Sequence, residues 1–350
     1  MVEKRSDHIL ILRFSALGDI AIAAPLVRTY AEANPAIRFT MVSQPIMEPL
    51  FEGVDNLDFF KIDIKGRHKG LRGLYRLSRE LRALKPSKVV DIHSVTRTMI
   101  LKLFMSIYSI PFFSIDKGRG ERAELTRRKD KNLRQLPSIM SRYENVLNGA
   151  GLSPLNFAEK EVDFRKKKHV RTMAEANRST QLGIGIAPFA KHKGKEWSLD
   201  YMEAVVATLS EEGRYTIYLF GGKGREATIL QGWEQRYSGV VSMAGKHTFT
   251  EELNVISELD LMVCMDSANM HFASYAGVPV LSIWGATHPY MGFYGWGQSP
   301  DMAVQVDLEC RPCSVYGNKE CYKGDWRCLH TINAQYVLDK INETVSIQRI

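Results

Sequence analysis

A short segment near the beginning of the chain combines residues that could carry acid–base chemistry. The run from Arg13 to Ile20 follows a short apolar stretch and contains Gly18 and Asp19. Glycine permits a tight turn, and a carboxylate placed there could act as a general base. Asp19 could equally be an acid in the first turn of a helix, where it favours the helix dipole. The run lacks the G-x-G-x-x-G spacing, so it gives no support for a dinucleotide site.

Two further segments could bind phosphate or a nucleotide. Lys195 comes shortly after an apolar run, where its ammonium could neutralise a phosphate; in a loop rich in lysine it could also be a solvated side chain. Gly221 and Gly222 end another apolar run and would let backbone amides approach a nucleotide. Glu226 could then accept hydrogen bonds from ribose hydroxyls, or serve only as an acid in the first turn of a helix.

The most specific segment runs from Asp266 to His271. Asp266 ends an apolar run, and Ser267 is expected to be the N-cap of the helix that carries His271. A helix that begins directly after a strand offers free amides to an anion. The turn Gly285 to Thr287 follows the next apolar run and offers further amides. His271 could contact a bound anion, or it could be a core histidine whose ring nitrogens are hydrogen-bonded within the protein.

Apolar runs alternate with helical spacing along the whole chain. Strands are expected at residues 8–14, 37–42, 88–92, 182–187, 215–220, 239–241, 259–265 and 278–284. Helices are expected at residues 20–33, 71–84, 98–108, 199–211, 224–235, 250–258, 270–276 and 334–345. This alternation predicts parallel sheets in two α/β domains. We place the domains at residues 1–170 and 171–350, with a hinge near 165–180 and a last helix that packs on either half. Ligands of such sheets bind at the carboxyl ends of the strands.

Taken in order, these segments resemble glycosyltransferase family 9, the ADP-heptose:lipopolysaccharide heptosyltransferases. The resemblance spans nearly the whole chain. It is carried by Arg13–Ile20, Asp91–Ser94, Lys195-x-Trp197, Gly221-Gly222-x3-Glu226, Asp266-Ser267-x3-His271, Gly285-x-Thr287, and a C-x2-C tail followed by Ile332 and Val337.

The resemblance implies a GT-B fold, in which two Rossmann-like domains face a cleft, and an inverting transfer that needs no metal. It implies that Asp19 takes the proton of the acceptor hydroxyl and that Lys195 stabilises the departing diphosphate. It further implies donor contacts from a set of residues in the second half: Lys195, Glu226, Asp266, Ser267, His271, Gly285 and Thr287. Ser267-Ala268 and His288 depart from the family's usual residues, which puts the sugar's identity in question more than the reaction class.

Two other readings of the sequence stay open. The chain could be a different nucleotide-sugar enzyme with a GT-B fold, one that uses another donor sugar or is an epimerase. It could also be a non-catalytic basic protein that binds nucleic acid. The second reading predicts strongly salt-dependent DNA binding that survives loss of Asp19.

The net charge of +8 is concentrated in two tracts, residues 65–82 and 117–134. Basic tracts suit anionic partners, or form solvated helix faces. Aromatic residues are not interleaved with the charges, which disfavours nucleic acid. Given the resemblance, we expect Arg67, Lys69 and Arg72 to bind an anionic, lipid-linked oligosaccharide acceptor or the membrane surface that carries it.

Four of the five cysteines cluster near the end of the chain. Cys264 lies in an apolar run and is expected to be inert core. The others are Cys310, Cys313, Cys321 and Cys328. Their spacing allows a structural zinc site, reduced packed thiols or a disulfide. A reducing compartment disfavours the disulfide.

The hydrophobic content of 45% suits a sizeable core in a 350-residue chain. The polar start of the chain and its short first apolar run do not resemble a signal peptide, and no apolar run is long enough to cross a membrane. We therefore expect a cytoplasmic protein that contacts the inner membrane peripherally, has no required cofactor and takes an ADP-sugar as its donor.

Overall fold

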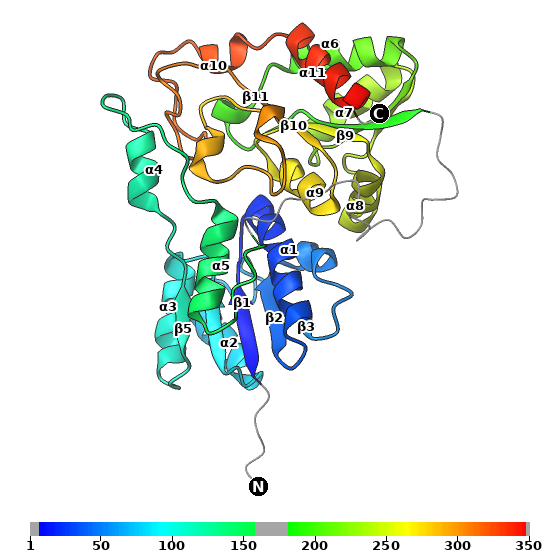
Figure 1. The fold of residues 1–350 in the computed structure, drawn as a ribbon. Coiled ribbons are helices and arrows are strands. Elements are labelled where there is room, and N and C mark those ends of the chain that lie inside the picture. Colours follow the sequence, from blue (N-terminus) through cyan, green and yellow to red (C-terminus); the bar gives the residue numbers. More distant parts are fainter. Residues whose placement is uncertain (1–6, 158–180, 348–350) are drawn as a thin grey trace. The chain divides into compact units, whose positions relative to one another are not determined.

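A computed structural model describes residues 7–157 and 181–347, so the expected hinge and the expected domain boundary at residue 170 lie outside the described residues. The chain divides into two compact units. The first comprises Met1–Arg119 and Pro137–Lys160, and the second comprises Gly120–Leu136 and Glu161–Ile350. Each unit has its own parallel sheet with helices packed on it, which is the α/β class that the alternation of elements predicts (Figure 1).

The first unit contains a parallel sheet in the order β3-β2-β1-β4-β5. Its strands are β1 (His8–Leu12), β2 (Arg38–Ser43), β3 (Leu57–Lys61), β4 (Lys88–Asp91) and β5 (Phe112–Ser114). Every residue of β1 is buried, as expected for a central strand that is covered on both faces.

Four helices cover this sheet: α1 (Leu17–Ala33), α2 (Gly70–Ala83), α3 (Thr96–Ser106) and α5 (Ile139–Gly149). Helix α1 packs against α5, and α2 packs against α3. Leu74, Leu77 and Leu81 recur at helical spacing on α2, and they are buried in the same core as the strand residues Leu10 and Leu12. This periodicity explains why residues 70–83 form a helix on the sheet.

The second unit contains a six-stranded parallel sheet in the order β11-β10-β9-β6-β7-β8. Its strands are β6 (Leu182–Ala187), β7 (Tyr215–Leu219), β8 (Val240–Ser242), β9 (Leu261–Met265), β10 (Val280–Ile283) and β11 (Ala303–Val304). Its main helices are α6 (Leu199–Glu211), α7 (Arg225–Arg236), α8 (Phe249–Glu258), α9 (Ala268–Ala276), α10 (Arg327–His330) and α11 (Ala334–Ile347). The last helix, α11, packs on α6 and belongs to this unit.

Residues 120–136 lie in sequence between the two parts of the first unit, but they pack with the second unit. They include most of the short helix α4 (Arg119–Leu125). Leu125 and Leu136 are buried with Met291 in a small apolar cluster. The Lys131 ammonium donates to the carbonyl oxygens of Glu309, Cys310 and Pro312 at 3.2, 2.9 and 3.0 Å. We call this segment the 120–136 strap.

Candidate active site

Both sheets reverse their strand order at one point, and open α/β sheets bind ligands at such points, beyond the carboxyl ends of the strands. In the first sheet the order reverses between β1 and β4, and in the second between β6 and β9. Asp19 follows β1 and His93 follows β4. Lys195 follows β6 and Asp266 follows β9. The residues predicted for chemistry therefore occupy the reversal point of each unit.

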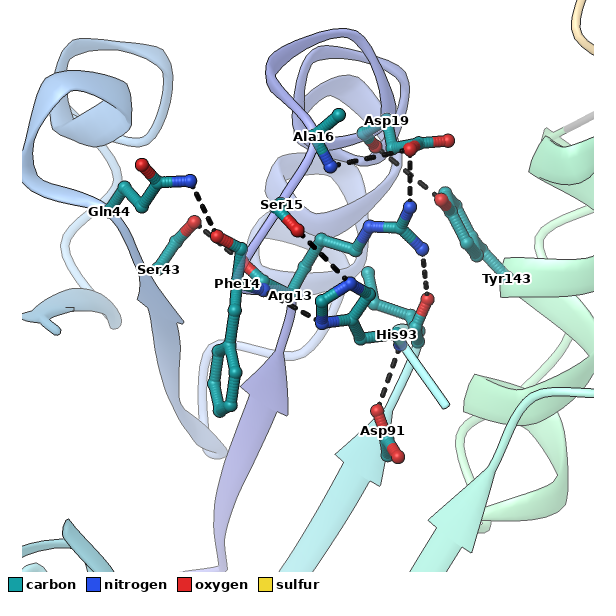
Figure 2. Close-up of polar contacts among 11 residues, drawn as sticks. Arg13, Phe14, Ser15, Ala16, Asp19, Ser43, Gln44, Asp91, His93 and Tyr143 are labelled. Atoms are coloured by element: carbon teal, nitrogen blue, oxygen red, sulfur yellow. Dashed lines mark hydrogen bonds and ion pairs between the residues drawn. The ribbon is translucent and has the colours of Figure 1, made fainter. Parts of the chain in front are cut away.

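In the first unit, Asp19 is held by the buried guanidinium of Arg13 (Figure 2). Arg13 Nη2 lies 2.5 Å from Asp19 Oδ2, while Arg13 Nη1 donates to the carbonyl oxygen of Ile92 at 2.7 Å. The Asp19 side chain is 26% exposed, so it stays accessible to a ligand. It also accepts the backbone N–H of Ala16 in the first turn of α1, at 3.4 Å. The helix-start role and the general-base role of Asp19 are thus compatible.

His93 supports the loop that carries Asp19. Its Nδ1 accepts the backbone N–H of Phe14 at 3.3 Å, and its Nε2 lies 3.4 Å from the Ser15 hydroxyl. Burial, followed by the charge of Arg13, lowers the pKa of His93 to about 3, so the ring is neutral. Because Nδ1 accepts, the ring proton resides on Nε2 and is donated to Ser15. His93 therefore shapes the loop and does not take a proton from an acceptor near neutral pH.

Lys117 adds a second cation near Asp19; the sequence placed it in the basic tract 117–134 without an individual role. Burial, followed by the nearby Arg13 and Arg119 guanidinium groups, lowers the pKa of Lys117 to about 8. The carboxylates of Asp19 and Asp91 act in the opposite direction. The first unit thus surrounds one accessible carboxylate with positive charge, an environment suited to an anionic acceptor.

In the second unit, Lys195, Asp266 and Thr287 form one contact cluster. Lys195 Nζ lies 2.8 Å from Asp266 Oδ2, and the Thr287 hydroxyl donates to the same oxygen at 2.8 Å. Asp266 is 5% exposed and Lys195 is 18% exposed. The buried carboxylate therefore orients a partly exposed ammonium, which remains within reach of a phosphate. The structure brings together three of the residues that the sequence predicted for donor binding.

Glycines let three loops meet beside Lys195. A Cβ on Gly285 would lie 2.6 Å from the carbonyl oxygen of Gly194, and a Cβ on Gly317 would lie 2.6 Å from the Lys195 side chain. Hydrogen bonds run from Ala286 N to Gly194 O at 2.7 Å and from Gly194 N to Gly317 O at 3.2 Å. Gly285 is therefore required for close backbone approach, which is how it serves the predicted donor turn.

Arg311 holds the turn Gly285–Thr287, which the sequence predicted to contact the donor. Arg311 itself was not identified from the sequence. Its buried guanidinium donates from Nε to the carbonyl oxygen of Gly285 at 2.6 Å and from Nη2 to that of Thr287 at 2.9 Å. Two fixed carbonyls set the orientation of the turn between them. The contact joins residues far apart in sequence, so a local motif cannot reveal it.

The start of α9 carries the next two predicted residues. Ser267 occupies the N-cap position of α9, but its side chain makes no capping bond. Its buried hydroxyl has no hydrogen-bond partner among the residues that the structure describes, which leaves it available to a ligand at the helix N-terminus. His271 is buried one turn further along α9.

Glu226 lies in the first turn of α7 and contacts its own loop. Its Oε2 accepts the backbone N–H of Gly222 at 2.6 Å. The carboxylate thus fixes the Gly221–Gly222 turn. Burial is the main cause of a raised pKa at Glu196, and the charge of Glu226 adds to it. Because Glu196 follows Lys195, Glu226 lies within electrostatic range of the donor loop.

The predicted acceptor residues lie on and before α2. Arg67 forms an ion pair with Glu80, and Lys69 is exposed at the N-cap position of α2. Arg67 and Arg72 line a pocket of about 520 Å³ together with Tyr75, Arg76, Arg79 and Glu80. The structure therefore gathers two of the three predicted residues in one basic pocket.

For the four clustered cysteines the sequence left zinc, reduced thiols and a disulfide open. Across residues 7–157 and 181–347, no three His, Cys, Asp or Glu side chains are arranged to hold a metal ion. All five cysteines are free thiols. Cys328 is part of the second unit's apolar core, and Cys313 and Cys321 pack against it. Burial raises the pKa of the Cys328 thiol to about 12. These contacts favour the alternative of reduced thiols that fill the end of the core, and Cys264 is fully buried as expected.

Comparisons with known proteins agree with the two-sheet α/β architecture. Residues 77–323 match glycosyltransferase family 9 (heptosyltransferase). A curated relative, the lipopolysaccharide core heptosyltransferase OpsX of Haemophilus influenzae, is 20% identical over 80% of this chain and 79% of its own.

Two solved structures resemble the fold over almost its full length. A family 9 glycosyltransferase from Veillonella parvula has a TM-score of 0.71 at 18% identity and 98% coverage of both chains. The Escherichia coli heptosyltransferase WaaC with ADP has a TM-score of 0.69 at 16% identity, over 96% of this chain and 99% of its own. The fold is GT-B, and the protein is a glycosyltransferase. The chain belongs to glycosyltransferase family 9, the heptosyltransferase family.

Proposed function

We propose that this enzyme transfers a heptose from ADP-heptose to the core of a lipopolysaccharide acceptor, with inversion at the anomeric carbon and without a metal. The match to the heptosyltransferase family over most of the chain supports the sugar and the acceptor. The solved structure of WaaC contains ADP, which supports an adenine nucleotide as the donor's leaving group.

The reaction would be a single displacement. An acceptor hydroxyl oxygen attacks the anomeric carbon while the bond between that carbon and the diphosphate oxygen breaks. ADP departs with the bonding electrons, and the hydroxyl proton passes to the carboxylate of Asp19. One displacement from the opposite face inverts the configuration. Asp19 suits this role because Arg13 holds its carboxylate while leaving it partly exposed.

The contact cluster of Lys195, Asp266 and Thr287 is the observation that carries the proposal. Negative charge grows on the diphosphate as the sugar leaves, and a preoriented cation stabilises that charge. Asp266 holds the Lys195 ammonium at 2.8 Å without burying it. The Ser267 hydroxyl and the N-terminus of α9 would add further donors. This set of donors can replace a metal at the diphosphate.

The remaining predicted residues would bind the two substrates. Glu226 would contact the nucleoside side of the donor, and His271 and Gly285 would line the sugar and phosphate region. Arg67, Lys69 and Arg72 would bind the anionic acceptor. We further propose that the enzyme acts in the cytoplasm, at the inner face of the inner membrane. Five free thiols fit a reducing compartment. Among the described residues no helix is long and apolar enough to cross a membrane.

An assay of nucleoside-diphosphate release (ADP, GDP or UDP, according to the donor) with a donor panel tests the proposal. Purified enzyme is given a heptose-deficient lipopolysaccharide core and, in turn, ADP-heptose, ADP-glucose, GDP-mannose and UDP-glucose. We expect turnover with ADP-heptose that persists in excess EDTA and yields a product of inverted anomeric configuration by NMR. Turnover with another donor alone would overturn the heptose assignment, and loss of activity in EDTA would overturn the metal-free mechanism.

A further inference from the structure

Helices α2 and α3 present large apolar side chains to solvent. Leu71 and Tyr75 on α2 are 64% and 51% exposed, and Met99, Leu103 and Ile107 on and just after α3 are 59%, 67% and 74% exposed. These five residues lie on two helices that pack against each other, visible side by side in Figure 1. Such a concentration differs from the scattered single apolar residues of an ordinary surface.

Helix α3 is apolar on opposite faces. Thr98, Leu101 and Met105 point into the core of the first unit. Met99, Leu103 and Ile107 recur every four residues and therefore form a stripe on the side away from that core. A helix with apolar residues on two opposite faces is typical of one covered on both sides. The outer stripe thus indicates a partner that the described chain does not supply.

Aromatic contacts join the two helices into one continuous surface. The rings of Tyr75 and Phe104 meet edge to face, with centroids 5.6 Å apart. The Arg82 guanidinium lies 3.7 Å from the centre of the Tyr108 ring. The apolar stripe of α3 therefore continues onto the exposed side of α2.

Positive charge borders this apolar surface. The pocket of about 520 Å³ on α2 is lined by Arg67, Arg72, Arg76 and Arg79, with Tyr75 and Glu80 completing its wall. Glu80 pairs with Arg67, so the charge of the other three arginines is not balanced by that carboxylate. Exposed Arg97 and Lys102 add charge on α3. We call this combined surface, from Leu71 to Arg82 and from Arg97 to Ile107, the α2–α3 face.

We propose that the α2–α3 face docks the enzyme onto an anionic lipid bilayer. The apolar side chains would enter the boundary between headgroups and acyl chains, and Arg76 and Arg79 would take a lipid phosphate, while Arg67 and Arg72 bind the acceptor as proposed above. Surface helices that bind membranes combine an apolar side with Arg and Lys in this way. The inference deepens the proposed function, since a lipid-linked acceptor lies in such a bilayer.

Two other partners fit this face less well. In a symmetric dimer the same patch meets itself, so its arginines would oppose one another. A soluble anionic saccharide would match the arginines but leave the stripe of Met99, Leu103 and Ile107 in water. A bilayer with acidic headgroups satisfies both the charge and the apolar area.

Vesicle sedimentation with the full chain tests the proposal. Vesicles of phosphatidylethanolamine with phosphatidylglycerol are compared with pure phosphatidylcholine vesicles at low and high salt. We expect binding to the acidic vesicles that weakens with salt, and much weaker binding to the neutral ones. The double variant Arg76→Gln/Arg79→Gln should bind acidic vesicles roughly tenfold or more weakly. Leu103→Gln/Ile107→Gln should weaken binding by roughly tenfold at both salt concentrations.

Matched controls come from the second unit. Arg236→Gln/Lys246→Gln removes two exposed basic residues, and Tyr336→Gln removes an exposed apolar one. Both should bind vesicles like the unsubstituted chain. Equal binding to acidic and neutral vesicles, or equal losses in control and α2–α3 variants, would overturn the proposal. So would a dimer in light scattering that becomes a monomer on Leu103→Gln/Ile107→Gln.

A second assay separates this inference from the proposed function. The Leu103→Gln/Ile107→Gln variant, which leaves every arginine of the basic pocket in place, is given ADP-heptose and a deacylated, water-soluble core acceptor. Retained turnover on this acceptor together with lost vesicle binding supports docking as a separate activity. If the unsubstituted chain turns over substrate but binds no vesicles, the transferase assignment stands and the docking proposal is wrong. If it binds vesicles but shows no turnover on any acceptor, the docking proposal stands and the transferase assignment is wrong.

Discussion

Each of the two units holds a partly exposed charged side chain with a buried partner of opposite charge, and the signs are reversed between the units. In the first, a buried cation, Arg13, holds the more exposed carboxylate of Asp19. In the second, a buried carboxylate, Asp266, holds the more exposed ammonium of Lys195. In each pair the buried member has 5–6% of its side chain exposed, while the outer member has 18–26%. In each pair the buried residue holds the more exposed one in place, and under the proposed function the exposed residue is the one that contacts substrate.

The pairs differ in how the chain encodes them. Arg13 and Asp19 belong to one loop between β1 and α1, so their contact follows from local sequence. Lys195 and Asp266 come from loops after two different strands, β6 and β9, and meet because those strands are neighbours in the sheet. The first pair is a local motif and the second is a product of topology. Their dependence on the rest of the fold should differ accordingly.

Removing the outer carboxylate of the first unit should have the largest effect. Asp19→Asn keeps the shape but cannot accept the acceptor proton, so kcat should fall by roughly 10²- to 10⁴-fold. Donor binding should hardly change, because Asp19 belongs to the first unit's pair. Steady-state kinetics and a thermal shift with ADP-heptose measure the two quantities. Asp58→Asn, which removes an exposed partner of Arg38, serves as control. A loss of kcat below tenfold rules Asp19 out as the base.

Removing the outer cation of the second unit should come next. Lys195→Met deprives the departing diphosphate of its ammonium, and kcat should fall by roughly 10²- to 10³-fold. ADP should also bind more weakly, unlike in Asp19→Asn. Titration calorimetry with ADP tests this contrast. Lys191→Met changes an exposed lysine of the same loop and should be nearly silent. If both lysine variants behave alike, the pairing with Asp266 has no catalytic meaning.

The dependence of the second pair on topology can be tested at Arg311. Arg311→Met leaves the carbonyl oxygens of Gly285 and Thr287 without their buried donor, at a cost of about 1–3 kcal/mol in unfolding free energy. The donor KM should rise more than kcat falls, since the turn is displaced and the reacting groups remain. Denaturant unfolding and donor-saturation curves give both values. Arg327→Met, at an exposed position, is the control. An unchanged donor KM contradicts a positioning role.

The smallest effect should be a shift in pH dependence in the first unit. Lys117 has a pKa of about 8, so its positive charge is present below that pH and lost as the pH rises through it. The KM for an anionic acceptor should therefore rise above about pH 8. Lys117→Arg keeps its charge at these pH values, so this rise should move upward by more than about one pH unit. The measurement is the acceptor KM of the unsubstituted chain and of Lys117→Arg from neutral to alkaline pH. If the two pH profiles superimpose, Lys117 does not take part in acceptor binding.

The sequence predicted most of the α/β framework. Fully buried strands such as β1 and β9 are continuous apolar runs, and α2 shows a regular apolar period. Among the elements that were not predicted are the short elements β5, β11, α4 and α10, together with the strand β3 and the helix α5. Strand β3 carries only one fully buried residue, Leu57, so its apolar pattern is weak. In α5 the buried face includes the polar residues Arg142 and Glu144, which mask its amphipathic period.

Three residues that the sequence singled out, Asp19, Lys195 and Asp266, follow strands, and the structure places them in ion pairs at the reversal points of the two sheets. Their roles in the reaction stay predictions. Arg311 contacts parts of the chain that are distant in sequence, so its neighbours gave no signal. Lys117 begins the basic tract 117–134, but the sequence gave it no individual role. The sequence left zinc, reduced thiols and a disulfide open for the four cysteines for a related reason, because cysteine spacing does not reveal that Cys328 lies in an apolar core.

The 120–136 strap has a practical consequence for dissecting the protein. A fragment ending at residue 160 would carry Leu125 and Leu136 without the apolar surface that buries them. The complementary fragment would keep the carbonyl oxygens of residues 309, 310 and 312. It would lose Lys131, whose ammonium donates hydrogen bonds to them. One cut cannot yield two self-sufficient halves. A donor-binding module made for ligand screening would have to carry the strap as a grafted piece, for instance through circular permutation.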